Sequence, residues 1–295
     1  MVKSRSSSWV SRARNGRNNA LSSDSAALRA ACDDGTGLCT IVRIDGSFSR
    51  RLGAQLAVRP DGSVVGSLAD GCLEKQLARE VLDGGDRRVQ RFGAGSELID
   101  FRLPCGSGLD ILIDPAPDRA ACRAAVERLD ARELAALALP QGPLEKRLYI
   151  PGLRLEVFGE GPELDALAAV GGALGLGVET HDKSARGMAL GRAPDLPPPD
   201  RWTAVVLLFH DHEWELPILE WALASDSFFI GAQGGRPSRE ERLERLAAAG
   251  HSDTACARIV SPLGLAGSSR EPAPLAVAAL AQIMALYEAL HPHHG

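Results

Sequence analysis

The stretch LRLEVFGEGPELDALAAVGGALGLGVETHD, residues 153–182, decides the fold of the second half of the chain. An apolar run predicts a strand at 153–158, helical spacing predicts a helix at 163–174, and a second strand is predicted at 177–181. This order of strand, helix and strand is the unit from which parallel sheets are built. We therefore expect a Rossmann-like parallel-sheet domain in this half.

The turn between the first strand and the helix reads GEGPEL. Gly159 and Gly161 permit a tight turn and close approach to a phosphate group, and Asp182 stands where an acid would accept hydrogen bonds from a ribose. Leu164, however, replaces the third glycine of the dinucleotide fingerprint, and Glu160 would place a negative charge beside a pyrophosphate. A nucleotide site and a purely structural turn both remain open.

Polar residues follow the next apolar strand, which is predicted at 204–209. His210, Asp211 and His212 come directly after it, and ligands of open parallel sheets collect beyond the carboxyl ends of strands. The spacing of the two histidines suits a metal ion, but a third ligand is missing and a solvated loop explains the residues equally well. We regard His210 and Asp211 as candidate site residues.

A further glycine-rich turn, GAQGGR, follows the strand predicted at 228–231. Its Arg236 would pair with a phosphate group. The segment SPLGL at 261–265 follows another strand, so three loops are expected to meet at one edge of the sheet. A plain turn between strand and helix is the alternative for each loop taken alone.

The two halves of the chain differ in character on either side of residues 139–152, where proline and glycine gather. We predict a linker there, between an N-terminal domain at 25–138 and the Rossmann-like domain at 153–295. Residues 1–24 are predicted to form a disordered basic tail, because they are rich in Lys, Arg, Ser and Asn and poor in apolar residues.

The N-terminal domain is expected to be an α+β unit of short strands, turns and two helices. Its strands are predicted at 38–44, 54–58, 63–68 and 109–114, its helices at 73–83 and 118–138, and the terminal helix of the chain at 275–290.

Two cysteines of the N-terminal domain stand on glycine turns. Cys72 follows Gly71 where a strand gives way to a helix, and Cys105 precedes Gly106 in LPCGSGLDI. A thiolate forms most readily near a helix N-terminus or a cation, so these positions suit a binding site. The loop GSFSRR adds Arg50 and Arg51, which would hold an anion, although an exposed arginine pair is more often a solvated turn.

Composition excludes several classes of function. The net charge is -5 and only 4% of residues are aromatic, so the chain lacks both the basic surface and the stacking platforms of a nucleic-acid-binding protein. No apolar stretch is long enough to span a membrane, and we expect no membrane role. The six cysteines have no C-x-x-C spacing and no secretory signal precedes them, which favours a reduced, cytoplasmic setting.

Several longer motifs carry a resemblance to a known family. In the first half these are GSFSRR (46–51), GAQLAV (53–58), DGSVVGSLADGCLE (61–74), RFG (91–93) and LPCGSGLDI (103–111). In the second half they are GEGPEL (159–164), LLFHDHEWELPILEWAL (207–223), FFIGAQGGR (228–236) and SPLGLAGSSREPAPLAVAALAQIMA (261–285). With these motifs the chain resembles the XdhC/CoxI family of xanthine dehydrogenase accessory factors over roughly 37–290.

The resemblance implies a chaperone that binds molybdenum cofactor, protects it and assists the exchange of an oxo for a sulfido ligand with a cysteine desulfurase. Such a protein hands the cofactor to a molybdenum hydroxylase of the xanthine dehydrogenase type, and a homodimer is expected. Cys72 and Cys105 match the two family cysteines and would contact the molybdenum. Arg50 and Arg51 would hold the phosphate of the pterin, and the crevice of the second domain would close over it.

Two alternatives belong to other classes. An NAD(P)-dependent oxidoreductase would use Gly159, Gly161 and Asp182 for the nucleotide, with Cys72 or His210 near the substrate. An interaction scaffold would carry its thiols as ordinary buried cysteines. Binding of a nicotinamide nucleotide favours the first, and a protein indifferent to loss of both glycine-flanked cysteines favours the second.

Overall fold

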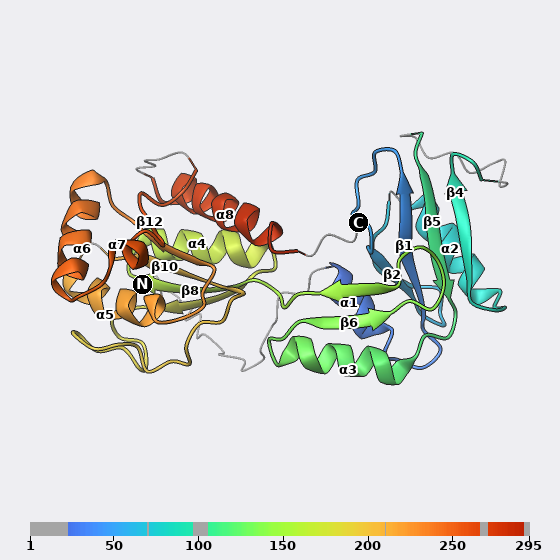
Figure 1. Cartoon of the computed structure of the whole chain (residues 1–295), viewed down its shortest axis with the longest axis horizontal. Helices are drawn as coiled ribbons and strands as arrows, with labels where there is room; N and C mark the ends of the chain where they lie inside the picture. Colours follow the sequence, from blue (N-terminus) through green and yellow to red (C-terminus); the bar gives the residue numbers. More distant parts are fainter. Residues whose placement is uncertain (1–22, 70, 97–105, 210, 266–270, 292–295) are drawn as a thin grey trace, which may run out of the picture.

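The chain forms two lobes arranged end to end (Figure 1). In this computed structural model the described residues are 23–69, 71–96, 106–209, 211–265 and 271–291. The N-terminal lobe ends with the strand at Lys146–Tyr149, and the C-terminal lobe begins with the strand at Arg154–Gly159. The expected tail lies almost entirely outside the described residues, which begin with helix α1 (Ser23–Ala30).

An antiparallel sheet forms the centre of the N-terminal lobe. Its strands are β1 (Gly37–Asp45), β2 (Gln55–Val58), β3 (Val64–Gly66), β4 (Arg88–Gly93) and β5 (Gly108–Asp114), in the order β3-β2-β1-β5-β4. Alternate residues of β1 face opposite sides, as the period of a strand requires. Cys39 and Ile41 pack with helix α2 (Cys72–Leu82), whereas Leu38 packs with α1 and α3 (Arg119–Asp130).

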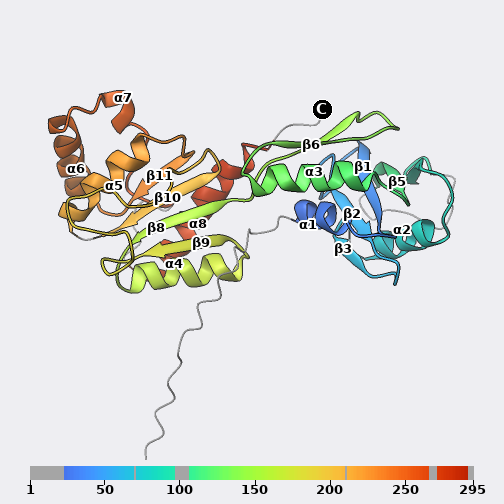
Figure 2. The ribbon, with the colours of Figure 1, turned by 90° about the horizontal axis from the view of Figure 1, so that it is seen from below.

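Two predictions for this lobe were wrong in detail. The helix predicted at 118–138 ends at Asp130, because Arg132 adopts a left-handed conformation with φ 64° and the chain then enters β6 (Ala135–Ala138). Strand β6 pairs with β7 (Lys146–Tyr149), which lies inside the segment predicted to be a linker. Figure 2 shows α3 lying along this hairpin, which gives the alanine-rich segment a partner that local helical spacing does not reveal.

The C-terminal lobe confirms the Rossmann-like expectation. Strands β8 (Arg154–Gly159), β9 (Gly177–His181), β10 (Thr203–Leu208), β11 (Phe229–Ala232) and β12 (Ile259–Val260) form a parallel sheet in the order β12-β11-β10-β8-β9. Helices α4 (Pro162–Ala173) and α8 (Pro272–Glu288) cover one face, and α5 (His212–Leu223), α6 (Arg236–Ala248) and α7 (Asp253–Cys256) cover the other. The connectivity reverses between β8 and β10, and this switch point is where such sheets bind ligands.

The parallel sheet points its carboxyl edge away from the N-terminal lobe. Arg132 of the N-terminal lobe donates to the Gly152 carbonyl, 2.5 Å away and just before β8, and to Asp200, just before β10. Both strands therefore begin at the junction of the lobes and run outward for roughly 20 Å, given their six residues each. Figures 1 and 2 agree, since α5 and α6 lie at the end of the molecule opposite the N-terminal lobe.

Within the described residues, no helix combines the length and the apolar character that a membrane span requires.

Candidate functional site

Three loops of the N-terminal lobe meet at one end of its antiparallel sheet. Asp45, the last residue of β1, pairs with Gly108, the first of β5. Beyond this pair the Ser107 hydroxyl donates to the Ser47 carbonyl. Arg50 Nη2 donates to Ser67 Oγ at 3.1 Å, which joins the loop after β1 to the loop after β3. The fold thus brings together the GSFSRR loop, the turn before Cys72 and the end of the LPCGSG motif.

The turn into α2 presents an exposed thiol. Gly71 has φ 97°, a left-handed conformation that favours glycine, and directly precedes the helix. Cys72 is the first helical residue, and its side chain is exposed to solvent. Cys105 lies outside the described residues, although Gly106 beside it has φ 69° and adjoins the loop cluster through Ser107.

The buried carboxylate of Glu74 holds the backbone of the turn before Cys72 in place. Its carboxylate accepts backbone hydrogen bonds from Leu68 (2.9 Å), Ala69 (2.6 Å) and Gly71 (2.7 Å) while the residue is only 7% exposed. Burial by itself raises the pKa of Glu74, but these N–H donors outweigh it and hold the pKa below its usual value. The carboxylate therefore stays charged at neutral pH and occupies the amides that an anion would otherwise use.

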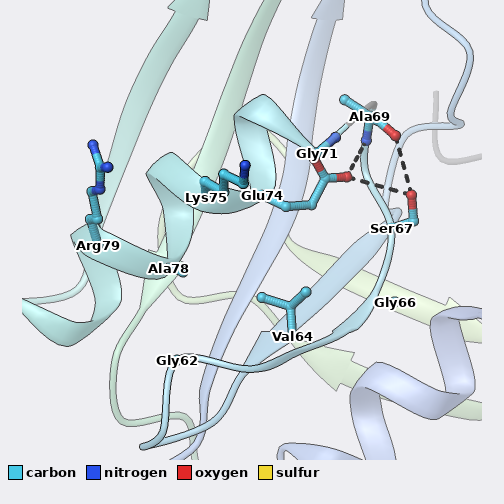
Figure 3. A pocket seen from close by; sticks show the side chains of 10 residues that line it. All are labelled: Gly62, Val64, Gly66, Ser67, Ala69, Gly71, Glu74, Lys75, Ala78 and Arg79. Carbon is cyan, nitrogen blue, oxygen red and sulfur yellow. Dashed lines mark hydrogen bonds between the residues drawn. The ribbon is translucent and has the colours of Figure 1, made fainter.

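An open pocket of about 590 Å³ lies between α2 and the strand β3. Val64, Gly66 and Ala78 supply an apolar lining, while Lys75 and Arg79 border it from the helix (Figure 3). No ion-pair partner for either cation is found among the residues that the structure describes.

Cys72 lies on the same side of α2 as these two cations. Residues 72, 75 and 79 are spaced by one and two helical turns, so they share one face of the helix. Lys75 and Arg79 therefore line the pocket, and the exposed thiol of Cys72 lies next to Gly71, which also lines it. That arrangement suits an anion with a flat apolar body and a soft, thiol-binding centre.

The two predicted anion-binding arginines have separate roles. Arg50 remains at the rim of the pocket through its contact with Ser67. Arg51 turns away, and its guanidinium group pairs with Glu288 near the end of α8 in the other lobe. Sequence reasoning missed Lys75 and Arg79, although their spacing from Cys72 on a predicted helix was a readable signal.

The switch point of the C-terminal lobe is filled by acidic side chains and one lysine. Glu160, in the GEGPEL turn, pairs with Lys183 Nζ at 2.8 Å, and the same ammonium lies 3.6 Å from Asp211. Gly159 packs against Leu208, and Gly161 has φ 82° before α4. Among the described residues of this turn, two carboxylates already surround the one cation, Lys183, which favours the structural interpretation of the turn.

Two further candidates at this edge, Asp182 and Arg236, have partners within the protein. Asp182 accepts hydrogen bonds from the backbone and hydroxyl of Ser184, both at 2.7 Å, and these lower its pKa. Arg236 is almost fully exposed and pairs with Glu240. His210 lies outside the described residues, and among those described no group of three His, Cys, Asp or Glu side chains could hold a metal ion.

A buried ion pair was not predicted from the sequence. Arg242 of α6 and Glu215 of α5 are each only 2% exposed and form two hydrogen bonds of 3.0 Å. Arg242 also donates to Ser261 Oγ and to the Gln233 carbonyl. This arginine therefore ties two helices to the loops after β11 and β12, which the sequence had assigned to a ligand crevice.

The structure does not bring the two predicted regions together. The pocket beside α2 belongs to the N-terminal lobe, whereas the carboxyl edge of the parallel sheet faces away from that lobe (Figure 1). Within one chain, the crevice of the second lobe does not close over the α2 pocket.

Both halves of the chain match known protein families. The XdhC and CoxI family matches residues 31–93, and the XdhC Rossmann domain matches residues 155–283. The chain is 32% identical over 270 residues to the molybdenum cofactor insertion chaperone PaoD of Escherichia coli strain K12, covering 84% of this chain and 82% of that protein.

A solved structure shares the arrangement of both lobes. The crystal structure titled as a xanthine dehydrogenase from Bacillus halodurans superposes with a TM-score of 0.69, covering 91% of this chain and 96% of the other, at 21% identity. The likeness extends over nearly the whole chain, so the two-lobed fold is shared.

Proposed function

The chain belongs to the XdhC and CoxI family, and on that premise we propose that it binds molybdenum cofactor as cargo and delivers it to a molybdenum enzyme. The relative PaoD is named for insertion of this cofactor, which supports the proposal. One structural observation carries it: on one face of α2, an exposed thiol lies close to two cations that line an apolar pocket and have no ion-pair partner among the described residues.

The side chains at this pocket fit the chemistry of the cargo. Molybdenum cofactor combines a flat pterin, a phosphate group and a dithiolene that carries the metal. Cys72 would meet the molybdenum or its sulfur atoms, because a soft metal-sulfur centre favours thiolate. Lys75 and Arg79 would hold the phosphate, and Arg50 would leave Ser67 to join them.

The proposal extends to steps that the family resemblance implies. We propose that the bound cofactor receives its sulfido ligand in partnership with a cysteine desulfurase, and that the client is a molybdenum hydroxylase of the xanthine dehydrogenase type. We also propose a homodimer. Within a dimer the carboxyl edge of one chain is able to approach the α2 pocket of the other, which the direction of the parallel sheet prevents inside one chain.

Retention of the cofactor by purified protein tests the proposal. The apo-protein is incubated anaerobically with molybdenum cofactor, and molybdenum and pterin are measured in the protein fraction after gel filtration. Near-stoichiometric retention is expected for the unaltered protein. We expect about tenfold weaker retention for Cys72→Ser and for the double variant Lys75→Glu, Arg79→Glu, since each removes a charge-assisted or metal contact. Cys105→Ala should also weaken retention, because Cys105 matches the second cysteine of the family motifs.

Matched controls separate the site from general effects of substitution. Cys32→Ser removes a half-buried thiol elsewhere in the lobe, and Arg239→Glu reverses an exposed cation on α6. Both variants should retain the cofactor as the unaltered protein does. Absence of retention by the unaltered protein would sink the proposal. Binding of a nicotinamide nucleotide that Asp182→Ala abolishes would replace it with the oxidoreductase alternative.

A further inference from the structure

A second cavity, of about 260 Å³, lies in the N-terminal lobe on the face of the antiparallel sheet opposite α2. Leu38, Thr40 and Leu112 form its floor on β1 and β5. The start of α3 and the β6 end of the hairpin form its walls, with Leu137 and Leu139 the largest apolar side chains there. This cavity is separate from the proposed cargo site because the sheet stands between them.

The floor of the cavity contains a buried hydrogen-bond donor. Tyr149 Oη donates to Gln55 Oε1 at 2.6 Å, and Gln55 Nε2 donates to Thr40 Oγ1 at 2.9 Å. Thr40 Oγ1 accepts the hydrogen bond from Gln55, so the hydroxyl proton of Thr40 is still available for donation. Thr40 is only 1% exposed and lines the cavity, and the described residues offer that proton no acceptor. A buried donor without an acceptor is costly, so a ligand acceptor would be favoured.

A guanidinium group supplies a second donor at the edge of the cavity. Arg87 uses Nε for Asp114 Oδ2 at 2.8 Å, and its Nη1 and Nη2 atoms have no partner among the described residues. The two carboxylates that line the cavity are already engaged. Asp114 accepts from Arg87 and from the Ala116 backbone, and Asp118 caps the first turn of α3.

The unused polar groups of this cavity are therefore donors. Arg87 neutralises Asp114, and the N-terminus of α3 offsets the charge of Asp118. A ligand must supply acceptors to Thr40 and Arg87 and apolar surface to the leucines. Guanidinium groups present paired N–H donors that match a carboxylate.

Strand geometry sets the size of such a ligand. Thr40 pairs with Leu112, and Leu38 pairs with Asp114, next to which Arg87 stands. The two rows are two residues apart along the strands, or roughly 7 Å, and β1 and β4 are separated by two strand spacings, roughly 10 Å. An extended arginine side chain spans part of this distance, so a single-ring molecule bridges the rest. The volume falls just below the usual range of drug-sized pockets.

We propose that this cavity is a second binding site, for a small monocarboxylate with an apolar body. The carboxylate accepts from Thr40 Oγ1 and the free nitrogens of Arg87, and the body packs between the sheet and the hairpin. The site is independent of the proposed cargo function, because it lies on the other face of the sheet and uses none of the same residues.

Ligand-observed NMR and calorimetry with benzoate test the proposal on the full chain. Benzoate should bind saturably in the millimolar range or tighter, whereas benzamide and benzylamine should bind at least about tenfold more weakly, since each loses a charge-assisted hydrogen bond. Thr40→Val keeps the shape of the side chain and removes the hydroxyl, and it should weaken benzoate binding by a similar factor.

A second pair of variants keeps the test decisive if Thr40→Val unfolds. Ala121→Phe places a ring in the cavity from the half-buried side of α3 and should abolish benzoate binding. Ala120→Phe, on the exposed side of the same turn, should leave it unchanged. No saturable benzoate binding by the unaltered protein, equal binding of benzamide or benzylamine, or undiminished binding by Ala121→Phe would each overturn the proposal.

Discussion

Arg132 Nε lies 2.6 Å from Asp200 Oδ2, and this contact joins the end of α3 in one lobe to the start of β10 in the other. The pair is bidentate, since Nη2 donates to Oδ1 at 2.9 Å. Among the described residues, Arg132 is the non-glycine residue with a positive φ, which is an unusual conformation. The Arg132–Asp200 pair, called the clamp below, and the bond from Arg132 to the Gly152 carbonyl hold this conformation in place. Together with the Arg51–Glu288 pair, this guanidinium group links the two lobes to each other.

The clamp should weaken in acid. Burial alone raises the pKa of Asp200. The hydrogen bond and charge of Arg132, with the Trp202 N–H and the Thr203 hydroxyl, lower it by more than burial raises it, so the pKa lies below its usual value. The ion pair stabilises the folded protein fully above the pKa of an aspartate in the unfolded chain, about 4. This stabilisation is lost as the pH falls through the lower pKa that Asp200 has in the folded protein. Asp200→Asn should cost roughly 1–3 kcal/mol at neutral pH and flatten this acid dependence.

Urea unfolding at a series of pH values measures the effect, and small-angle scattering reports the lobe orientation. Asp195→Asn, an exposed position in the same proline-rich segment, is the matched control and should behave as the unaltered protein does. An unchanged acid dependence in Asp200→Asn would contradict the clamp.

Cys72 should be alkylated first among the described cysteines under native conditions. Its side chain is exposed, whereas Cys39, Cys122 and Cys256 are buried. Burial raises the pKa of Cys39 to about 12 and that of Cys122 to about 11, so their thiolates are scarce as well as hidden. Iodoacetamide labelling followed by peptide mass spectrometry should separate the rates by orders of magnitude. In urea the difference should disappear, and native labelling of Cys39 as fast as Cys72 would refute the placement of α2.

Glu74→Gln should loosen the turn before the exposed thiol. The amide retains one acceptor oxygen and turns an NH₂ group toward a backbone N–H, so at least one buried donor loses its partner. We expect a loss of roughly 1–3 kcal/mol in the free energy of unfolding. Hydrogen exchange at the Ala69 and Gly71 amides should rise. Glu127→Gln on the exposed side of α3 serves as the control, and unaltered exchange in Glu74→Gln would exclude this role.

Breaking the buried pair of the C-terminal lobe should be the most destabilising of these changes. Glu215→Gln leaves the Arg242 charge buried without a counter-charge, at a cost of roughly 3–5 kcal/mol. The double variant Glu215→Leu, Arg242→Met removes both charges and should recover much of that loss. Calorimetric melting compares the two. A double variant less stable than Glu215→Gln would show that the bonds of Arg242 to Ser261 and Gln233 dominate instead.

Local patterns predicted the C-terminal lobe better than the N-terminal one. The strand at 177–181 has the predicted bounds, and β8 and α4 differ from prediction by one residue at each end. Strand β4 was missed because Arg88, Gln90 and Arg91 alternate with few apolar residues, and ion pairs with Glu80 and Asp110 stabilise those arginines. Those pairs form only once the sheet and α2 are assembled.

By itself the sequence determined the succession of strand, helix and strand that begins the parallel sheet, and the position of Cys72 at a helix start. Both depend on neighbours within a few residues, through hydrophobic period and glycine conformation. Only the tertiary structure decided that Arg51 forms an ion pair with Glu288 and Lys183 one with Glu160. It also decided that the carboxyl edge of the parallel sheet faces away from the α2 pocket. These features depend on contacts between residues in different helices, strands and loops. Which residues meet is set by the packing and the charges of the folded chain.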